Sequence, residues 1–325
     1  MSDNPILAVF PQRLLDELDH IEALLAEQAD STDPDLAAWN LEVVAAGGKR
    51  VRPLLLLAAF EACGGRRLGD EAVRQAYRAA TSVELIHTAS LVHDDIMDEA
   101  KERRGKPSTV AAHGLTGAIL VGDYLFTQAF ALSAALPHGA HDLVAHACRR
   151  LCQGQLHEQR LAAAGRPDRD GYRQVIRDKT AALLSAATGA GAVLARADPA
   201  TVERLTRYGE AVGTAFQVLD DVLDVAGDPA WTGKPAGTDY VAGTMSSPYL
   251  HHLERGGELP PAAGRQAKDF PAVRDDLFAS GAVAASQQEA GAYTQAALLD
   301  VERLPPSEAR DALVRLAELL MQRVQ

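Results

Sequence analysis

Cysteine and aromatic residues are both scarce in this chain. Among its 325 residues there are three cysteines, and phenylalanine, tryptophan and tyrosine together make up 5%. A small, odd number of cysteines does not suit a framework of structural disulfides and indicates a reducing compartment. An interior with few aromatic side chains and many alanines favours close packing of long helices around a central space.

Basic residues are also in deficit. The chain has 32 Lys and Arg against 44 Asp and Glu, which gives a formal net charge of -12 and a pI near 5.3. Nucleic acids and anionic membranes do not attract an acidic surface, so neither is expected as a partner.

Long uncharged runs of the kind that cross a bilayer are not expected either. The longest weakly charged stretch that we identify, residues 181–195, is rich in Ala and Gly and too short to span a membrane. The N-terminus carries Asp3 and no basic segment leading into an apolar run, which does not suit a secretory signal. With the cysteine content, these features predict a cytoplasmic protein without a transmembrane segment.

Clean strand alternation between hairpin signals does not occur in the sequence. Apolar residues instead recur with the helical period in nine segments. These segments are 14–29, 54–63, 72–97, 118–136, 143–159, 172–194, 202–225, 281–301 and 307–324. Short Gly and Pro breaks separate them, and nothing at mid-chain resembles a linker. The sequence therefore predicts an all-α protein, a single helical bundle around a central apolar cavity, with one domain over residues 1–325.

Two acidic clusters of the same form stand out. Residues 94–98 read DDIMD and residues 220–224 read DDVLD, and each cluster ends an apolar helical run. Residues four apart share a helical face, so each cluster presents two carboxylates that repel unless a cation lies between them. Two such faces turned toward one another would bind hard cations, and Mg²⁺ with phosphate oxygens is expected there. The alternative is a pair of solvated acidic stretches, which suits the surrounding Leu, Ile and Val less well.

Basic groups accompany the carboxylates in a pattern that fits polyphosphate. Lys49 and Arg52 lie in a Gly-rich segment just before an apolar helix, where they could grip an anion. Arg103 and Arg104 follow the first cluster, where they either bind an anion or merely neutralise the carboxylates. Further polar groups lie around the second cluster: Lys179 and Thr180, which are expected to open a helix, Gln217 and Lys234.

Together these groups describe two anion sites, one bridged through metal to carboxylates and one held by Lys and Arg without metal. A reaction between two diphosphates needs both. Loss of diphosphate from an allylic carbon builds negative charge on the leaving oxygens, which Mg²⁺ and Lys stabilise. The remaining carbocation must be kept from water, and an apolar cavity among helices would do so.

The chain resembles the trans-isoprenyl diphosphate synthases (polyprenyl diphosphate synthases) over nearly its whole length. Seven motifs in the family's order carry the resemblance: GGKRVRP at 47–53, ELIHTASLVHDDIMD at 84–98, RRG at 103–105, GDYLF at 122–126, KT at 179–180, FQVLDDVLD at 216–224 and KPAGTD at 234–239. The resemblance implies a homodimeric prenyltransferase of the isoprenoid synthase fold. It would condense isopentenyl diphosphate head-to-tail with an allylic diphosphate and use three Mg²⁺ ions in each active site.

The same resemblance implies roles for individual residues. Metal ligands would be Asp94, Asp98 and Asp220, with Asp95, Asp221 and Asp224 binding or orienting beside them. The allylic diphosphate would be bound by Arg103, Lys179, Thr180, Gln217 and Lys234, of which the two lysines also assist catalysis. Isopentenyl diphosphate would be bound by Lys49, Arg52, His87 and Arg104. A hydrogen-bonded core histidine is the alternative for His87, although it lies two helical turns from Asp94 on the same face.

One departure from the family pattern lies beyond the second cluster. Thr244 stands where the family usually has a second lysine, so a cation that would help the leaving group is missing. The surrounding residues 231–265 are rich in Gly and Pro, and form either a mobile cover of the site or an ordinary surface connection.

In the family that the chain resembles, bulky residues just before the first cluster limit the length of the product. Here Ala89 and Ser90 are small, so the product is expected to extend along the helix toward Ile86, at about 5.4 Å per turn. Phe126 and Phe130 are four apart and either form a deeper floor or pack in the core. We therefore expect an all-trans product longer than C20.

Other functions fit the sequence less well. A geranylgeranyl (C20) or farnesyl diphosphate synthase would keep every catalytic residue and differ only in the depth of its tunnel. A terpene cyclase needs no second diphosphate site, and a non-catalytic partner subunit would have lost acidic residues from a cluster. A calcium-binding module would need an Asp-x-Asp-x-Asp-Gly loop with a later Glu, which the sequence lacks.

Overall fold

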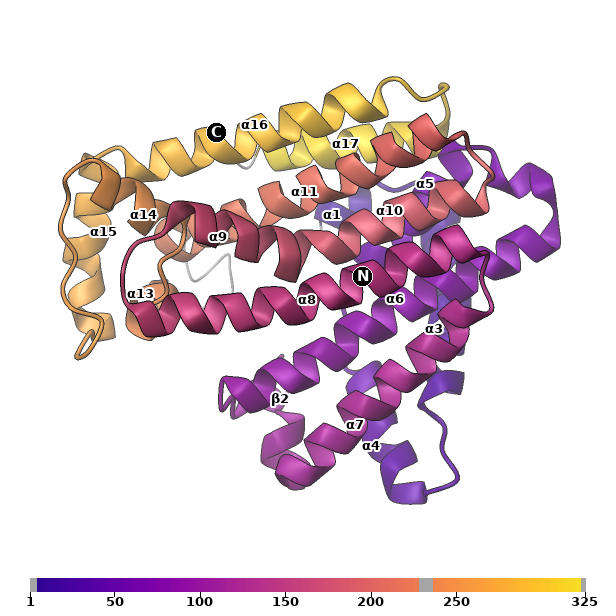
Figure 1. The fold of residues 1–325 in the computed structure, drawn as a ribbon, viewed down its shortest axis with the longest axis horizontal. Helices are drawn as coiled ribbons and strands as arrows, with labels where there is room; N and C mark the ends of the chain where they lie inside the picture. The colour runs from indigo at the N-terminus through magenta and orange to yellow at the C-terminus, as the bar shows by residue number, and fades with distance from the viewer. Residues whose placement is uncertain (1–4, 228–235, 323–325) are drawn as a thin grey trace. The chain divides into compact units, whose positions relative to one another are not determined.

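The computed structural model describes residues 5–227 and 236–322. In this part of the chain, helices account for nearly all regular structure, and the only strands form one two-stranded antiparallel hairpin (Figure 1). The prediction of an all-α protein is confirmed.

The chain forms two compact units. The first comprises residues 1–148, 186–206 and 303–313, and the second comprises residues 149–185, 207–302 and 314–325. The single domain expected over residues 1–325 stays a prediction.

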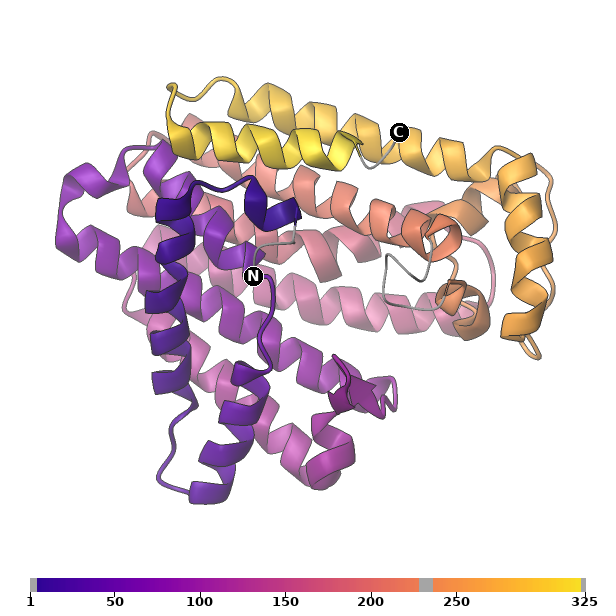
Figure 2. The same ribbon diagram turned by 180° about the vertical axis from the view of Figure 1, so that it is seen from behind.

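The first unit contains the N-terminal helices and the helix that carries the first acidic cluster. Its elements are α1 (Pro5–Ala8), α2 (Gln12–Asp16), α3 (Leu18–Ala29), α4 (Pro34–Ala45), α5 (Val51–Ala62), the 3-10 helix η1 (Gly65–Leu68), α6 (Asp70–Met97), β1 (Glu102–Arg103), β2 (Lys106–Pro107) and α7 (Thr109–Ala134). The long helices α6 and α7 pack against each other, and α3 and α4 lie against them. Helices α3 and α4 are drawn in indigo in Figure 2.

The second unit contains the helices around the second acidic cluster. Elements wholly within it are α9 (Arg169–Ile176), the π-helical turn η2 (Arg177–Ala181), α13 (Thr238–Ala242), α14 (Ser247–Glu254), the 3-10 helix η3 (Ala267–Asp269), α15 (Phe270–Ala279) and α16 (Ala282–Val301). The boundary between the units falls within four helices: α8 (His138–Ala164), α10 (Ala182–Leu194), α11 (Pro199–Ala226) and α17 (Glu308–Gln322).

The core of the first unit forms where α5 and α6 pack together. Residues 54–57, all leucines, are at most 3% exposed, and small residues such as Ala79 and Ala80 of α6 are fully buried. Gly191 of α10 approaches the α5 backbone so closely that a Cβ there would lie 2.4 Å from the Leu56 carbonyl oxygen. Small residues therefore let these helices pack backbone to backbone, as the scarcity of aromatic residues predicted.

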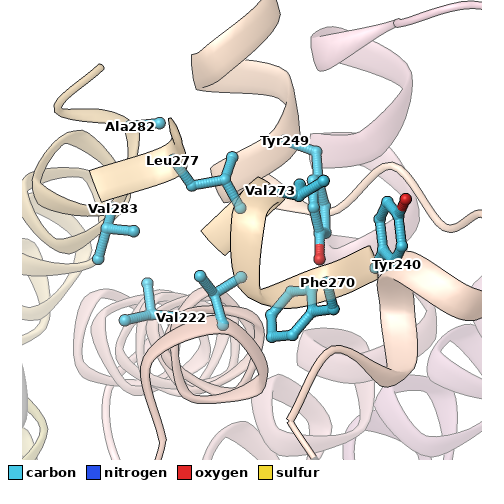
Figure 3. Close-up of a cluster of buried hydrophobic side chains, with 9 residues drawn as sticks. Val222, Tyr240, Tyr249, Phe270, Val273, Leu277, Ala282 and Val283 are labelled. Carbon is cyan, nitrogen blue, oxygen red and sulfur yellow. The ribbon is translucent and has the colours of Figure 1, made fainter. Parts of the chain in front are cut away.

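The core of the second unit includes side chains from the same helical turns as the second acidic cluster. Val222 and Val225 of α11 are at most 3% exposed and belong to a buried group with Tyr249 and Phe270 (Figure 3). Burying a side chain of this size stabilises the fold by roughly 1.5–3 kcal/mol. Because Asp224 lies between the two valines in the sequence, their packing fixes the helix turn that presents it.

Sequence periodicity predicted most of the long helices. The segments 72–97, 202–225 and 281–301 correspond to α6, α11 and α16 within three residues at each end. The helix expected over 172–194 is wrong in one respect, because the π-helical turn η2 interrupts it. Lys179 and Thr180 accordingly lie inside this turn and do not open a helix.

Helix α7 is long and apolar. Among the residues that the structure describes, α7 alone meets the length and apolarity of a membrane span, with 33% of that window buried. It is longer than residues 181–195, so the expectation that 181–195 is the longest weakly charged stretch is wrong. One face of α7 packs on α6, as in the core helix of a globular domain, and its other face exposes Leu115, Ile119, Leu120 and Phe130.

Candidate active site

The first acidic cluster lies at the C-terminal end of α6. Asp94 is half-buried, Asp95 is 1% exposed, and Asp98 is exposed and caps the helix. The C-terminal end of a helix carries partial negative charge, so carboxylates there are unfavourable unless a cation offsets them. The local fold thus presents negative charge where only a bound cation, or a nearby basic residue, can balance it.

Arg103 of β1 provides part of that balance. Its guanidinium approaches Asp95 to 2.7 Å, and its Nε donates to both carboxylate oxygens of Asp95 at 2.8 and 2.9 Å. The structure therefore realises the neutralising role that the sequence left open for Arg103. Its predicted contact with the allylic diphosphate stays a prediction.

A second group of cations surrounds the start of α5. Lys49 and Arg104 are exposed, and Arg52 and His87 are half-buried. Arg104 lies in the turn between β1 and β2 with a left-handed backbone, and a Cβ added to Gly48 would lie 3.2 Å from its Nη2. The glycine pair therefore lets Arg104 come close to the segment that carries Lys49 and Arg52.

Arg50 anchors this segment from beneath. Its backbone is left-handed (φ 46), and its guanidinium pairs with Glu84 of α6 at 3.0 Å and with Glu22 of α3 at 2.6 Å. It also donates to the carbonyl of Val44. Burial lowers the pKa of Arg50, but the hydrogen bond and charge of Glu22 and the charge of Glu84 outweigh it and hold the pKa above its usual value. Arg50 is thus a structural cation, held by two carboxylates and a backbone carbonyl.

Those neighbours repel one another. Burial and then the charges of Arg50 and Arg103 lower the pKa of Arg104, and burial lowers the pKa of Arg52. Burial and the charges of Arg52 and Arg104 hold the pKa of His87 well below its usual value, so the imidazole is neutral. The Nε of Arg52 is buried without a hydrogen-bond partner. A cluster with surplus positive charge and an orphaned donor is suited to an anion such as a diphosphate.

The second acidic cluster lies near the C-terminal end of α11. Asp220 is exposed, Asp221 is 5% exposed and Asp224 is half-buried. The two clusters share one design, since each has a buried aspartate flanked by more exposed ones. Whether the two clusters face each other stays a prediction.

Asp221 is held by donors from three helices. It accepts hydrogen bonds from the hydroxyl of Tyr172 on α9 at 2.5 Å, from Gln217 of α11 at 3.0 Å and from the backbone N–H of Ser247 on α14 at 3.2 Å. Burial and then the charge of Asp239 raise the pKa of Asp221 to about 7, although these hydrogen bonds act in the opposite direction. Thr180 donates to Gln217 at 3.0 Å, so two predicted ligands of the allylic diphosphate connect to Asp221.

Asp224 has a second task that the sequence did not indicate. Its carboxylate accepts hydrogen bonds from the backbone N–H groups of Thr238 and Asp239, at 3.0 and 3.1 Å, and so caps the N-terminus of α13. The KPAGTD motif is thereby tied to the second cluster at its C-terminal end.

Asp239 is a site residue that the sequence analysis missed. Burial and then the charges of Asp224 and Asp220 raise its pKa to about 6, so a fourth carboxylate joins the second cluster. Its place at the end of the KPAGTD motif was the available signal. Glu84 and Tyr172, which position Arg50 and Asp221, and Glu158, which pairs with Lys179, were also missed.

Lys179 projects from the π-helical turn η2 and pairs with Glu158 of α8 at 2.6 Å. Two glycines make room for this turn. A Cβ on Gly154 would lie 2.8 Å from the backbone N of Lys179, and one on Gly213 would lie 2.6 Å from the Cα of Ala181. Wide turns of this type are frequent at functional sites, because they redirect a side chain out of the regular helix.

The remaining predicted site residues are Lys234, Thr244 and those expected to limit product length. Lys234 lies outside the described residues, as does part of the segment 231–265, whose described portion forms α13 and α14. Thr244 is exposed. Ile86, Ala89 and Ser90 are buried on α6, Phe126 and Phe130 of α7 lie with ring centroids 6.4 Å apart, and Phe130 is 39% exposed. Their roles in product length stay predictions.

The carboxylates suit Mg²⁺ in their chemistry. Around the second cluster the charges of Asp224 and Asp220 raise the pKa of Asp239, and a bound cation would relieve this repulsion. Among the residues that the structure describes, no group of three His, Cys, Asp or Glu side chains already forms a metal cage. Mg²⁺ commonly binds through one or two carboxylates, completed by water and substrate phosphates, and the residues present fit that mode.

Comparison with known proteins gives a consistent result. A family model described as polyprenyl synthetase matches residues 34–269. A short chain isoprenyl diphosphate synthase from Methanothermobacter thermautotrophicus is 35% identical over 308 residues, which cover 91% of this chain and 92% of that protein.

Solved structures agree. The crystal structure of polyprenyl synthase from Caulobacter crescentus, complexed with calcium and isoprenyl diphosphate, has a TM-score of 0.85 and 32% identity over 95% of each chain. A decaprenyl diphosphate synthase from Rhodobacter capsulatus has a TM-score of 0.88 and 31% identity, covering 99% of this chain and 100% of that one.

Proposed function

The chain belongs to the polyprenyl synthetase family and is a trans-isoprenyl diphosphate synthase, and we propose that it makes an all-trans polyprenyl diphosphate longer than C20. In each cycle it would condense isopentenyl diphosphate head-to-tail with an allylic diphosphate, using Mg²⁺. As a prenyltransferase it serves isoprenoid biosynthesis.

One observation carries the two-substrate proposal. A single helix, α6, bears His87 beside the cation cluster and, two turns later, the carboxylates of Asp94 and Asp98. The cation cluster can bind a diphosphate without metal, whereas the carboxylates need metal to do so. Two diphosphates held in these two ways is the arrangement that a condensation requires.

The residues divide the work as follows. Lys49, Arg52 and Arg104 would hold the diphosphate of isopentenyl diphosphate, with neutral His87 as a hydrogen-bonding partner. Lys179 and Gln217 would contact the allylic diphosphate, whose C–O bond breaks and leaves an allylic cation for the isopentenyl double bond to attack. Bound at the aspartates, three Mg²⁺ ions would offset the charge that develops on the departing diphosphate.

Loss of a proton then restores a double bond and completes each cycle. Among the residues around the cation cluster, His87 is too acidic when protonated to hold a proton near neutral pH. We therefore assign the proton to the departing diphosphate, which is released with it.

Product length is proposed from the buried face of α6. Ala89 is fully buried and Ser90 is 7% exposed, so small side chains lie where bulky ones would close a tunnel toward the buried Ile86. The similarity to a short chain synthase supports a second candidate, a C20 or shorter product. Incubation with farnesyl and isopentenyl diphosphates, followed by dephosphorylation and chromatography, decides between them. Products beyond C20 support the long-chain proposal, and a ladder that stops at C20 rejects it.

A homodimer is proposed from the exposed face of α7. Leu115 and Leu120 are 56% and 50% exposed, and Ile119 and Phe130 are also open to solvent. Exposed apolar side chains gathered on one helix often mark an interface, and a second copy of α7 is the proposed partner. Sedimentation equilibrium should give twice the chain mass for the wild type. Leu120→Glu should then give the mass of one chain, and a monomeric wild type would reject the proposal.

A further inference from the structure

Glu289 is a buried carboxylate that belongs neither to the two acidic clusters nor to the sequence motifs. It belongs to α16, and its side chain is 8% exposed. Arg173 donates to its Oε1 at 2.8 Å, and Arg169 and His251 contact its Oε2 at 3.1 and 3.0 Å. Since both arginines belong to α9 and His251 belongs to α14, one carboxylate ties two helices to α16 (Figure 1).

The charge at Glu289 is permanent at physiological pH. Burial by itself would raise its pKa, but the hydrogen bonds from His251 and Arg173 and the charges of the two arginines lower it to about 2. A charge-assisted hydrogen bond is stronger than a neutral one. The junction at Glu289 is therefore a strong local restraint.

The two helices that Glu289 restrains supply two of the three donors to Asp221. Tyr172, which donates its hydroxyl to Asp221, directly precedes Arg173 on α9. Ser247, whose N–H donates to Asp221, lies one helical turn before His251 on α14. A buried hydrogen bond of 2.9 Å from Ser247 to Ser286 of α16 ties the same turn to the helix that carries Glu289.

We propose that Glu289 is a positioning residue for the second acidic cluster, because it holds α9 and α14 at the spacing that keeps Tyr172 and Ser247 on Asp221. It touches neither substrate nor metal in this account. Its effect passes through Asp221 to the adjacent Asp220, and so to metal bound with the allylic diphosphate. The inference rests on the proposed metal-dependent reaction and adds to it a residue that no motif contains.

A matched control lies on the same helix. Asp300 of α16 is also largely buried, at 17% exposed, and pairs with Arg207 of α11 at 2.7 Å. This pair likewise joins α16 to another helix, but neither residue belongs to α9 or α14. Asp300→Asn therefore reports what the loss of one interhelical ion pair of α16 does when the contacts from α16 to α9 and α14 are left in place.

The first test compares Glu289→Gln with Asp300→Asn. The readouts are Mn²⁺ bound per chain, measured by equilibrium dialysis with inorganic diphosphate, and KM for each substrate. We expect Glu289→Gln to weaken Mn²⁺ binding and raise the KM of the allylic diphosphate tenfold or more. The KM of isopentenyl diphosphate should stay within twofold, because the cation cluster proposed to bind it belongs to the first unit. Asp300→Asn should leave all three values within twofold.

A second test covers the case in which Glu289→Gln does not fold. His251→Gln removes the imidazole that joins α14 to Glu289, together with its contact to Arg169 at 3.0 Å, and leaves the Arg173 contact in place. It should produce the same pattern at smaller size. In the double variant with Tyr172→Phe, the fold-changes should be less than multiplicative, because both substitutions act through Asp221.

The proposal is overturned if Mn²⁺ binding is unchanged in the folded variants, if Asp300→Asn has an equal effect, or if the fold-changes multiply. The outcome is distinguishable from failure of the proposed function. A wild type that binds Mn²⁺ but condenses no isopentenyl diphosphate would refute the function, while a Mn²⁺ loss in Glu289→Gln that is absent from Asp300→Asn would still support the positioning role.

Discussion

Arg50 and Glu84 form an ion pair of 3.0 Å in which each side chain is only 4% exposed. The pair joins the segment just before α5 to the middle of α6, and so connects the GGKRVRP motif to the helix that carries His87 and Asp94. The second oxygen of Glu84 is buried without a hydrogen-bond partner. A buried pair with an unsatisfied atom is costly to build, which suggests that its value lies in fixing the geometry of the cation cluster.

Glu84→Gln tests this junction. The substitution leaves the buried charge of Arg50 with Glu22 as its one acidic partner among those described above, so we expect the free energy of unfolding to fall by ~3 kcal/mol. The KM of isopentenyl diphosphate should rise several-fold, because Arg50 no longer fixes Lys49 and Arg52. Glu22→Gln is the control: its carboxylate side chain is 45% exposed, so it should cost under ~1 kcal/mol. Equal losses in urea denaturation would show that burial of the pair is unimportant.

Asp98→Asn should separate stability from activity. Asp98 is exposed at the C-terminal cap of α6, where a negative charge opposes the helix dipole. Removing the charge should stabilise the metal-free protein by ~0.3–1 kcal/mol and lower turnover by a factor of ~100 or more. Thermal unfolding with chelator measures the first effect and the condensation assay the second. A variant that is destabilised without metal, yet fully active, would contradict a metal-binding role.

Ala89→Phe tests the tunnel along α6. If Ala89 lines a tunnel, the aromatic ring fills empty space, the product shortens, and the first condensation proceeds at a rate close to that of the wild type. If Ala89 packs in a filled core, the ring costs ~1–3 kcal/mol and the product distribution stays the same. Ala284→Phe, at an exposed position of α16, should change neither property. Chromatography of the dephosphorylated products together with urea denaturation distinguishes the two results.

Glu289 gives a pH dependence of definite sign. Its pKa is about 2 in the folded protein and roughly 4.3 in an unfolded chain. A lowered carboxyl pKa contributes stability that is fully present above the unfolded value and is lost as the pH falls through 4 toward 2. The contribution is ~3 kcal/mol near neutral pH.

The difference in unfolding free energy between wild type and Glu289→Gln should therefore be largest above pH 5 and shrink toward pH 3. Urea denaturation across this range measures it, with Asp275→Asn at a 76% exposed carboxylate as the control. A difference that stays constant with pH would mean that the ion pairs of Glu289 contribute nothing.

The sequence predicted the fold and the motif residues because both depend on local patterns. Helical periodicity marked α6, α11 and α16, and the two clusters marked the ends of α6 and α11. Helix α4 was missed although its signal is present: Asp33 accepts hydrogen bonds from the N–H groups of Asp35 and Leu36, and Pro34 occupies the first turn.

Other features had no local signal. The π-helical turn at Lys179 depends on the close approach of Gly154 and Gly213, which lie on other helices. The pairing of Arg50 with Glu84, and of Glu289 with its three partners, joins residues 34 or more positions apart. Periodicity cannot indicate which distant charges meet, so the residues that position the site became visible only in three dimensions.

The most direct test of the account is the dependence of condensation on divalent metal. Purified protein is incubated with farnesyl diphosphate and labelled isopentenyl diphosphate, first with Mg²⁺ and then after complete chelation. A prenyltransferase that needs Mg²⁺ should elongate the chain with Mg²⁺, show no elongation after chelation, and recover when Mg²⁺ is restored. Elongation that continues undiminished without metal, or no elongation in its presence, would contradict it.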